Sequence, residues 1–172
     1  MGMTPYELML QLLAKADDPF SGGRTYYSHP SLNRQDMPKM PHQSSATGMQ
    51  AIPATGAAHG IKYKETQGMI DGAEKPIVIC SLGDGSVTEG EVAESLQMAV
   101  LHKLPIIYLI QDNDWGISAS GDEMRAMDAF EYGLGFKGLR RIRVNGSDFL
   151  QCHDEMKRAI DSTRRRAATS RC

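Results

Sequence analysis

The sequence predicts an α/β fold built on a doubly wound parallel sheet. Residues 76–82 and 105–110 are short apolar runs rich in β-branched side chains, which is typical of parallel strands buried on both faces. Between them, residues 89–102 place their apolar side chains on one helical stripe. A third strand over 140–144 and a last helix over 148–166 continue the alternation of strand and helix that defines this fold class.

An amphipathic helix is predicted at the N-terminal end, over residues 6–14. Leu8, Leu12 and Leu13 share one side of it and are expected to face inward. Polar residues interrupt the stretch, it lacks a basic leader, and it is far shorter than the ~20 apolar residues of a membrane span. We therefore expect neither a membrane-spanning segment nor an export signal.

A long connection is predicted over residues 16–47, which are rich in Gly, Pro, Ser, Asn and His. Loops of this length inside a domain are usually functional. Residues 48–62 consist mainly of small side chains and predict a helix, with Pro53 in its first turn, that a ligand or another backbone can approach closely. The polar residues 64–75 predict a second connection.

The helix predicted over residues 89–102 begins at a capping signal. Thr88 and Glu91 have the spacing of a capping box, in which each side chain accepts the other residue's backbone N–H. Farther along, a short helical stretch is predicted near residues 122–130, inside a glycine-rich segment.

Composition places the chain among ordinary globular proteins. It has 172 residues, enough for one domain, with 41% hydrophobic and 23% charged residues and a net charge of −2. A pI near 6.2 argues against a nucleic-acid partner. The three cysteines form no CxxC pair, which indicates reduced thiols and a cytoplasmic location.

The charge is distributed unevenly along the chain. Residues 1–136 carry nine basic and 17 acidic side chains, whereas residues 137–172 carry ten basic and four acidic ones. A basic C-terminal segment suits phosphates or acidic partners, but a solvated helix with a frayed end has the same composition. The sequence leaves both interpretations open.

Polar sequences follow two neighbouring predicted strands. Gly-Asp-Gly at 83–85 follows the first strand, and Asp-Asn-Asp at 112–114 follows the second. Because ligands bind such sheets at the carboxyl ends of the strands, these side chains are expected to converge. An Asp-Gly pair also favours a hairpin turn, but here a helix follows it rather than a second strand.

The residue types at these strand ends suit a magnesium-bridged diphosphate. Asp84 and Asn113 offer a carboxylate and an amide oxygen, and Mg²⁺ prefers a few such protein ligands together with phosphate oxygens and water. The backbone N–H groups of Gly85 and Ser86, near the start of a helix, can point at a phosphate without steric hindrance. A diphosphate-bearing cofactor bridged by Mg²⁺ uses both strand ends.

The stretch from the Gly-Asp-Gly at residue 83 to Asn113 resembles the thiamine diphosphate motif. The wider resemblance is to the α subunit of the 2-oxo acid dehydrogenase E1 component, with the branched-chain (2-oxoisovalerate) type most similar. Three further blocks in the right order carry it, at residues 22–29, 44–58 and 141–148. The resemblance covers about residues 5–165 and implies a partial thiamine diphosphate-binding fold.

The resemblance implies roles for individual residues. Asp84, the Asn113 side chain and the Trp115 backbone oxygen are the implied Mg²⁺ ligands, and His29 is the implied catalytic residue facing the active-site channel. The implied cofactor-binding residues are Ser45, Thr47, Gly83, Gly85, Ser86, Gln111 and Ile117.

Two positions depart from the family pattern. Gln111 stands where the branched-chain type carries a phosphate-binding arginine. Ser44, Ala46 and Gln50 match a loop that holds a monovalent cation, K⁺, in some members, but Met49 stands where those members carry a threonine ligand.

The function implied by the resemblance is thiamine diphosphate–Mg²⁺ binding within an oxidoreductase that oxidatively decarboxylates a small 2-oxo acid. The acyl group then passes to a lipoyl-bearing E2. Residues 1–166 are the implied cofactor-binding domain, which is incomplete, and 167–172 are a tail that does not resemble the family. Because a β portion, separate or fused, supplies the other half of the active site, we expect an oligomer and an inactive chain in isolation.

Two alternatives stay open at this stage. One is another thiamine diphosphate enzyme, such as transketolase or a pyruvate- or acetoin-type E1. The other is a truncated, non-catalytic domain that acts only in subunit association.

Overall fold

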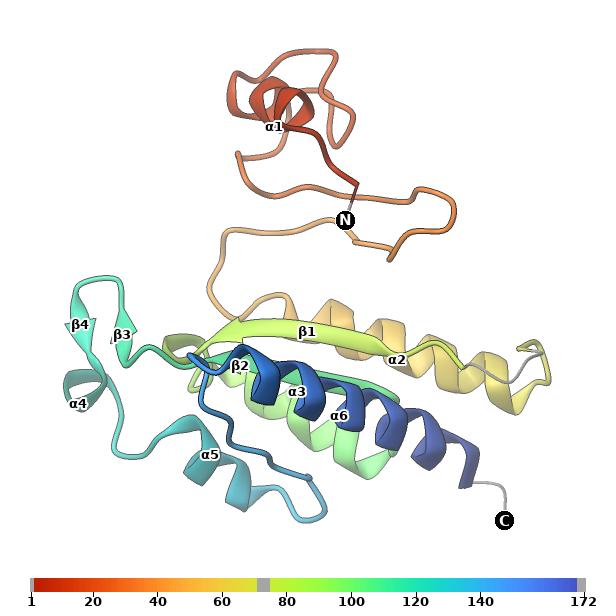
Figure 1. The fold of residues 1–172 in the computed structure, drawn as a ribbon, viewed down its shortest axis with the longest axis vertical. Helices are drawn as coiled ribbons and strands as arrows, with labels where there is room; N and C mark the ends of the chain where they lie inside the picture. The colour runs from red at the N-terminus through yellow and green to blue at the C-terminus, as the bar shows by residue number, and fades with distance from the viewer. Residues whose placement is uncertain (1, 71–74, 170–172) are drawn as a thin grey trace. The chain divides into compact units, whose positions relative to one another are not determined.

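The computed structural model describes residues 2–70 and 75–169. The chain divides into two compact units, Met1–Ala46 and Thr47–Cys172 (Figure 1). Among the described residues, the N-terminal unit contains helix α1 and the second unit contains the parallel sheet and the remaining helices.

The N-terminal unit opens with α1 (Pro5–Leu12). Thr4 precedes it as N-cap, and its hydroxyl accepts the Glu7 N–H at 3.3 Å. The Glu7 carboxylate in turn accepts the Thr4 N–H at 2.8 Å. This reciprocal cap, followed by a proline at the first helical position, defines where the helix begins.

The prediction that Leu8, Leu12 and Leu13 face inward is wrong, because these side chains are 38%, 49% and 57% exposed. The buried side chain of the helix is Gln11. Its amide nitrogen donates to the His29 carbonyl at 3.1 Å, and its amide oxygen accepts the His29 N–H at 3.2 Å. A glutamine can satisfy both groups of the loop backbone whereas a leucine can satisfy neither, which explains the buried polar position.

The long connection after α1 is organised around the buried Asp18 carboxylate. It accepts the backbone N–H groups of Phe20, Ser21 and Gly23 at 2.9–3.2 Å, and the Ser21 hydroxyl at 2.7 Å. Burial disfavours the charged form, but these hydrogen bonds favour it more, so the pKa of Asp18 lies below its usual value.

This shift predicts that acid loosens the loop after α1. Because the folded-state pKa of Asp18 is lowered, its stabilising contribution is present above the unfolded-state pKa of about 4 and is lost as pH falls further. The protection factors of the Phe20 and Gly23 amides, which correct the exchange rate for its intrinsic dependence on pH, are expected to fall below about pH 4. In Asp18→Asn these protection factors are already low at neutral pH, whereas the exposed neighbour Asp17→Asn keeps the wild-type profile. Unchanged protection in Asp18→Asn contradicts this account.

The second unit begins with α2 (Ala51–Thr66), which lies three to four residues later than predicted and keeps Pro53 in its first turn. Its small residues allow close packing. Thr55 is buried, and its hydroxyl donates to the Ala51 carbonyl at 2.7 Å and lies 2.6 Å from the Tyr108 hydroxyl of the sheet.

Two strands form the parallel sheet of the described residues, β1 (Val78–Gly83) and β2 (Ile106–Gln111). They are paired in register along their length, so that their last residues, Gly83 and Gln111, are partners. Helix α3 (Gly90–Leu101) connects them. The prediction of a mixed α/β fold with a parallel sheet is confirmed to this extent.

The core lies on one face of the sheet. Cys80 and Leu82 of β1 pack there against Val92 and Leu96 of α3 and against α2. On the other face Ile79 is 48% exposed, so the prediction of burial on both faces is wrong for β1. Within the described residues α2 and α3 cover the Cys80 face, while the last helix, α6 (Phe149–Thr169), runs along β2 (Figure 1).

The start of α3 differs from the prediction. Its N-cap is Glu89, without a side-chain hydrogen bond, so the predicted Thr88–Glu91 capping box is wrong. A 3₁₀ turn, η1 (Asp84–Ser86), runs almost directly into the helix, and the Glu89 N–H donates to the Ser86 carbonyl. The backbone of this turn, and not a side-chain cap, therefore holds Glu89 at the start of the helix.

Short elements fill the segment after β2. Strands β3 (Trp115–Gly116) and β4 (Ala119–Ser120) form an antiparallel pair. The helical stretch predicted near 122–130 is two helices, α4 (Gly121–Met124) and α5 (Ala129–Tyr132). A second 3₁₀ turn, η2 (Gly133–Gly135), follows.

The third predicted strand is wrong, because residues 140–144, all within the described part of the chain, form no strand. Their side chains bind Phe130 instead. The Arg141 guanidinium donates to the Phe130 carbonyl at 2.7 Å, and the Arg141 and Arg143 guanidinium groups lie 4.3 and 4.7 Å from the centre of its ring. Cation–π and hydrogen-bonding contacts to Phe130 therefore hold residues 140–144 in place, although their alternating apolar pattern predicted a β-strand.

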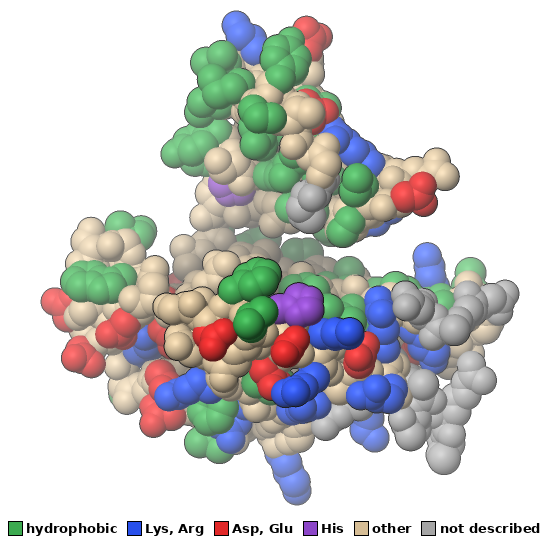
Figure 2. All heavy atoms as spheres, viewed as in Figure 1, with side chains coloured by type: hydrophobic (Ala, Val, Ile, Leu, Met, Phe, Trp, Pro, Cys, Tyr) green, Lys and Arg blue, Asp and Glu red, His purple; other side chains and the backbone are tan. Residues whose placement is uncertain are grey.

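The last helix, α6 (Phe149–Thr169), begins one residue later and ends three residues later than predicted. Figure 2 shows Lys and Arg side chains in the region of this helix, with Asp and Glu side chains among them. None of the helices in the described residues is both long and apolar enough to cross a membrane.

Candidate functional site at the carboxyl ends of β1 and β2

The carboxyl ends of β1 and β2 lie side by side because Gly83 is paired with Gln111. Asp84, the first residue after β1, therefore lies close to Asp112, the first residue after β2. The carboxylates of Asp84, Asp112 and Asp114, here called the acidic cluster, each offer an oxygen within 4.8 Å of the others. Two turns 28 residues apart in the chain thus meet at one edge of the sheet.

A pocket of about 360 Å³ lies at this edge. It brings together every predicted cofactor or metal residue of the second unit, namely Thr47, Gly83, Asp84, Gly85, Ser86, Gln111, Asn113, Trp115 and Ile117. Gly116 and Met124, which were not predicted, complete the lining. A Cβ atom at Gly116 would lie 2.5 Å from the Met124 sulfur, so a side chain at this position would displace the end of the Met124 side chain.

Asp84 is the most buried acid of the pocket, with 2% of its surface exposed. One oxygen accepts the Arg125 Nη1–H at 2.6 Å, and the carboxylate also accepts the backbone N–H of Asn113. Burial alone raises the pKa of this acid, but the guanidinium and the backbone hydrogen bonds lower it more. Asp84 is therefore held ionised, as a ligand of a hard cation must be.

Arg125 is the residue that sequence reasoning missed. It directly follows α4, its side chain is 6% exposed, and its second terminal nitrogen lies 3.0 Å from Asp114 and 3.4 Å from Asp112. One signal was available in the sequence: Arg125 is the sole basic residue between Lys103 and Lys137, amid six acidic residues. Nothing in the sequence showed which of these acids it binds.

The loop after β2 has strained backbone. Asp114 and Ile117 have φ values of +62° and +58°, in the left-handed region. For a β-branched residue such as Ile117 this conformation costs roughly 1–2 kcal/mol. The Ile117 side chain is nevertheless fully exposed at the pocket, and strain of this kind concentrates at functional sites.

Asn113 is oriented by the same loop. Its side-chain oxygen accepts the Trp115 N–H at 3.0 Å, and the Asp112 carboxylate accepts the Asp114 N–H at 3.2 Å. These turns hold the amide oxygen at the pocket lining, where a lone pair is left for a further contact.

His29 and Ser45 belong to the N-terminal unit, Met1–Ala46. The His29 Nδ1 atom lies 2.6 Å from the Tyr27 carbonyl. Because a carbonyl only accepts hydrogen bonds, Nδ1 is the donor in this contact. Of the predicted cation loop, Ser44 accepts the Ala46 N–H at 3.2 Å.

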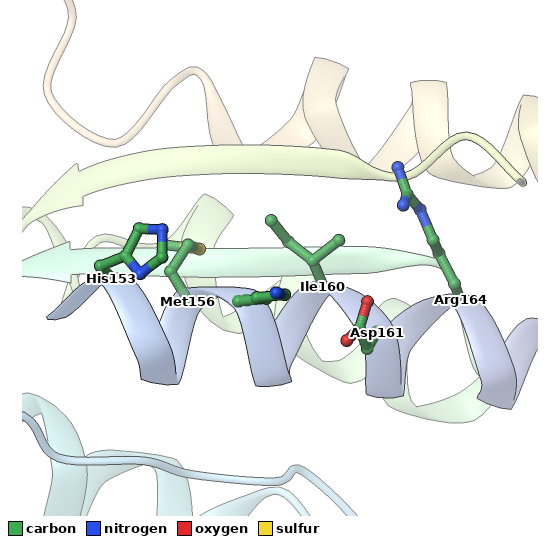
Figure 3. A pocket seen from close by; sticks show the side chains of 6 residues that line it. His153, Met156, Ile160, Asp161 and Arg164 are labelled. Atoms are coloured by element: carbon green, nitrogen blue, oxygen red, sulfur yellow. The ribbon is translucent and has the colours of Figure 1, made fainter. Parts of the chain in front are cut away.

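A larger hollow, of about 420 Å³, lies on one side of α6 (Figure 3). Its lining, from His153 to Arg164, comes entirely from that helix. A site that performs chemistry needs groups converging from several elements, as at the strand ends. The pocket at the carboxyl ends of β1 and β2 is therefore the candidate functional site.

The family model of the dehydrogenase E1 component matches residues 1–169. The chain belongs to the dehydrogenase E1 component family. Its Gly-Asp-Gly turn and the loop after β2 thus line a pocket within the segment that this E1 family model covers.

Individual relatives of this E1 chain are α subunits. It is 30% identical to the 2-oxoisovalerate dehydrogenase subunit alpha of Bacillus subtilis over 95% of its own length and 46% of that protein. It is 33% identical to the pyruvate dehydrogenase E1 component subunit alpha of Rickettsia bellii, over 68% of its length and 33% of the relative. A 3-methyl-2-oxobutanoate dehydrogenase subunit alpha of Mycobacterium tuberculosis is 30% identical over 68% of the chain. The E1 chain thus spans less than half the length of these relatives.

Proposed function

We propose that this chain binds thiamine diphosphate through Mg²⁺ as part of the α subunit of a 2-oxo acid dehydrogenase E1, an oxidoreductase. The observation that carries the proposal is the convergence of two strand ends on one pocket, with the residues of the thiamine diphosphate motif in its lining. The α-subunit relatives and the family match support it.

The donor set of the pocket fits a magnesium diphosphate. The Asp84 carboxylate is buried and ionised, and Asn113 adds an amide oxygen. The Trp115 backbone oxygen is the third proposed ligand. Glycines at 83, 85 and 116 let a diphosphate approach the backbone closely, and the Gly85 and Ser86 N–H groups are its proposed donors.

The remaining roles divide between positioning and proton transfer. Thiamine diphosphate, when bound, supplies the nucleophilic carbon for decarboxylation of the 2-oxo acid. Thr47, Gln111 and Ile117 are proposed to contact the cofactor from the pocket lining. His29 is the proposed catalytic residue, in a proton-transferring role, and Ser45 is a proposed cofactor contact from the N-terminal unit.

The assembly is part of the proposal. An E1 β portion is needed to complete the active site, and a lipoyl-bearing E2 is needed to receive the acyl group, so the protein works as an oligomer in the cytoplasm. We favour a branched-chain 2-oxo acid over pyruvate, because the 2-oxoisovalerate relative matches 95% of the chain and the pyruvate relative 68%. A doubly wound thiamine diphosphate-binding fold over residues 1–166, with a K⁺ loop around Ser44, belongs to the same proposal.

Calorimetric titration with thiamine diphosphate and Mg²⁺ tests the binding step. We expect saturable heat for the wild type and at least about a hundredfold weaker binding for Asp84→Asn, because that change removes the only buried negative charge of the pocket. Asp154→Asn, which changes a 65% exposed acid on α6, is the matched control and is expected to bind like the wild type. Equal heats for the wild type and Asp84→Asn contradict the proposed function.

A further inference from the structure

Arg125 occupies the place in the acidic cluster where a cation is expected. One terminal nitrogen binds Asp84 at 2.6 Å, and the other contacts Asp114 at 3.0 Å and Asp112 at 3.4 Å. One guanidinium faces three carboxylates, which leaves two net negative charges. The side chains of Arg125 and Asp84 are 6% and 2% exposed, so this ion pair is buried, whereas Asp112 and Asp114 lie at its solvent-exposed side.

Gly121 makes this arrangement possible. Its backbone N–H donates to the Asp114 carbonyl at 2.9 Å. A Cβ atom at this position would lie 1.9 Å from an Asp114 carboxylate oxygen and 2.9 Å from the Arg125 Nη2. The Asp114 carboxylate and the Arg125 guanidinium therefore lie against the Gly121 backbone at the start of α4. A side chain at this position would push both groups out of their present contact.

We propose that Arg125 is an internal counter-ion that keeps divalent cations out of the acidic cluster until a diphosphate is present. The inference rests on the proposed function, whose Mg²⁺ site shares Asp84. It adds a condition to that function, namely that the metal binds with the diphosphate and not before it.

The electrostatics of the two ligands explain this condition. A free divalent ion at Asp84 places a second positive charge beside the guanidinium, which holds one oxygen of that carboxylate at 2.6 Å. A diphosphate offers that guanidinium other acceptors, because its planar donors match phosphate oxygens as well as they match carboxylates. The negative charge of the anion offsets the repulsion between the metal and the guanidinium, which the metal alone cannot do.

The test titrates the chain with Mn²⁺ alone, with free Mn²⁺ measured by electron paramagnetic resonance. We expect weak binding by the wild type and about tenfold or tighter binding by Arg125→Gln, because the carboxylates then lack a competing cation. Arg143→Gln removes a 61% exposed arginine that pairs with Asp128 outside the cluster, and is expected to match the wild type. Adding Asp114→Asn to Arg125→Gln should reverse the gain.

A second variant, which keeps a positive charge at position 125, guards against the case in which Arg125→Gln fails to fold. Arg125→Lys keeps the charge but lacks the fork that reaches several carboxylates, so it should bind Mn²⁺ with intermediate affinity. If both variants bind Mn²⁺ no better than the wild type, the proposal is overturned. The titration contains no thiamine diphosphate, so tighter Mn²⁺ binding supports it even if the wild type fails to bind the cofactor, which would count against the proposed function alone.

Discussion

Asp84→Ala is expected to lower the free energy of unfolding by about 3 kcal/mol. The substitution removes the buried partner of a guanidinium that is itself 6% exposed, and uncompensated buried charges cost this much. The remaining partners, Asp112 and Asp114, have side chains 43% and 70% exposed and replace only part of the lost interaction. Urea denaturation monitored by circular dichroism measures the change.

The double variant Asp84→Ala with Arg125→Met separates this cause from a packing effect. Removing both charges leaves no unpaired buried group, so most of the lost stability should return. If the double variant is as unstable as Asp84→Ala alone, the loss reflects the shape of the carboxylate and not the unpaired arginine.

Leu82→Ala is expected to cost about 2–5 kcal/mol of unfolding free energy. Leu82 is 2% exposed and lies in the cluster where β1 meets α2 and α3. Its loss leaves a cavity in the layer that supports the Gly-Asp-Gly turn directly after it, so thermal denaturation should shift to lower temperature and cofactor binding should weaken with it.

Ile79→Ala, three residues earlier on the same strand, is the matched control. Ile79 is 48% exposed on the other face of β1, so the expected loss is below about 1 kcal/mol. Equal losses for the two variants would show that both faces of β1 are covered and would contradict the one-sided core described above.

The parallel pair and its connecting helix were predictable from sequence. Residues 76–82 and 105–110 carry a signal that is local, because a short β-branched run between turn residues favours a strand wherever it lies. The burial of only one face of β1 was not predictable, since an apolar run does not reveal whether other elements cover both faces of the strand.

Three errors share one cause. Gln11 is buried in place of its leucine neighbours, Glu89 starts α3 in place of Thr88, and residues 140–144 form no strand in the described structure. In each case a partner distant in sequence or a preceding turn satisfies the backbone or the side chain. Hydrophobic periodicity and capping patterns reflect only interactions between residues a few positions apart in the sequence.

The sequence by itself determined the chemistry of the candidate site. Gly-Asp-Gly and Asn113 stand at the ends of two adjacent strands, and the register of a parallel pair obliges those ends to meet. The tertiary structure alone decided what neutralises Asp84. Arg125 lies 41 residues after Asp84 in the chain, and the short strands β3 and β4 and helix α4 bring the two side chains together. An ion pair between such distant residues depends on three-dimensional packing and leaves no local pattern in the sequence.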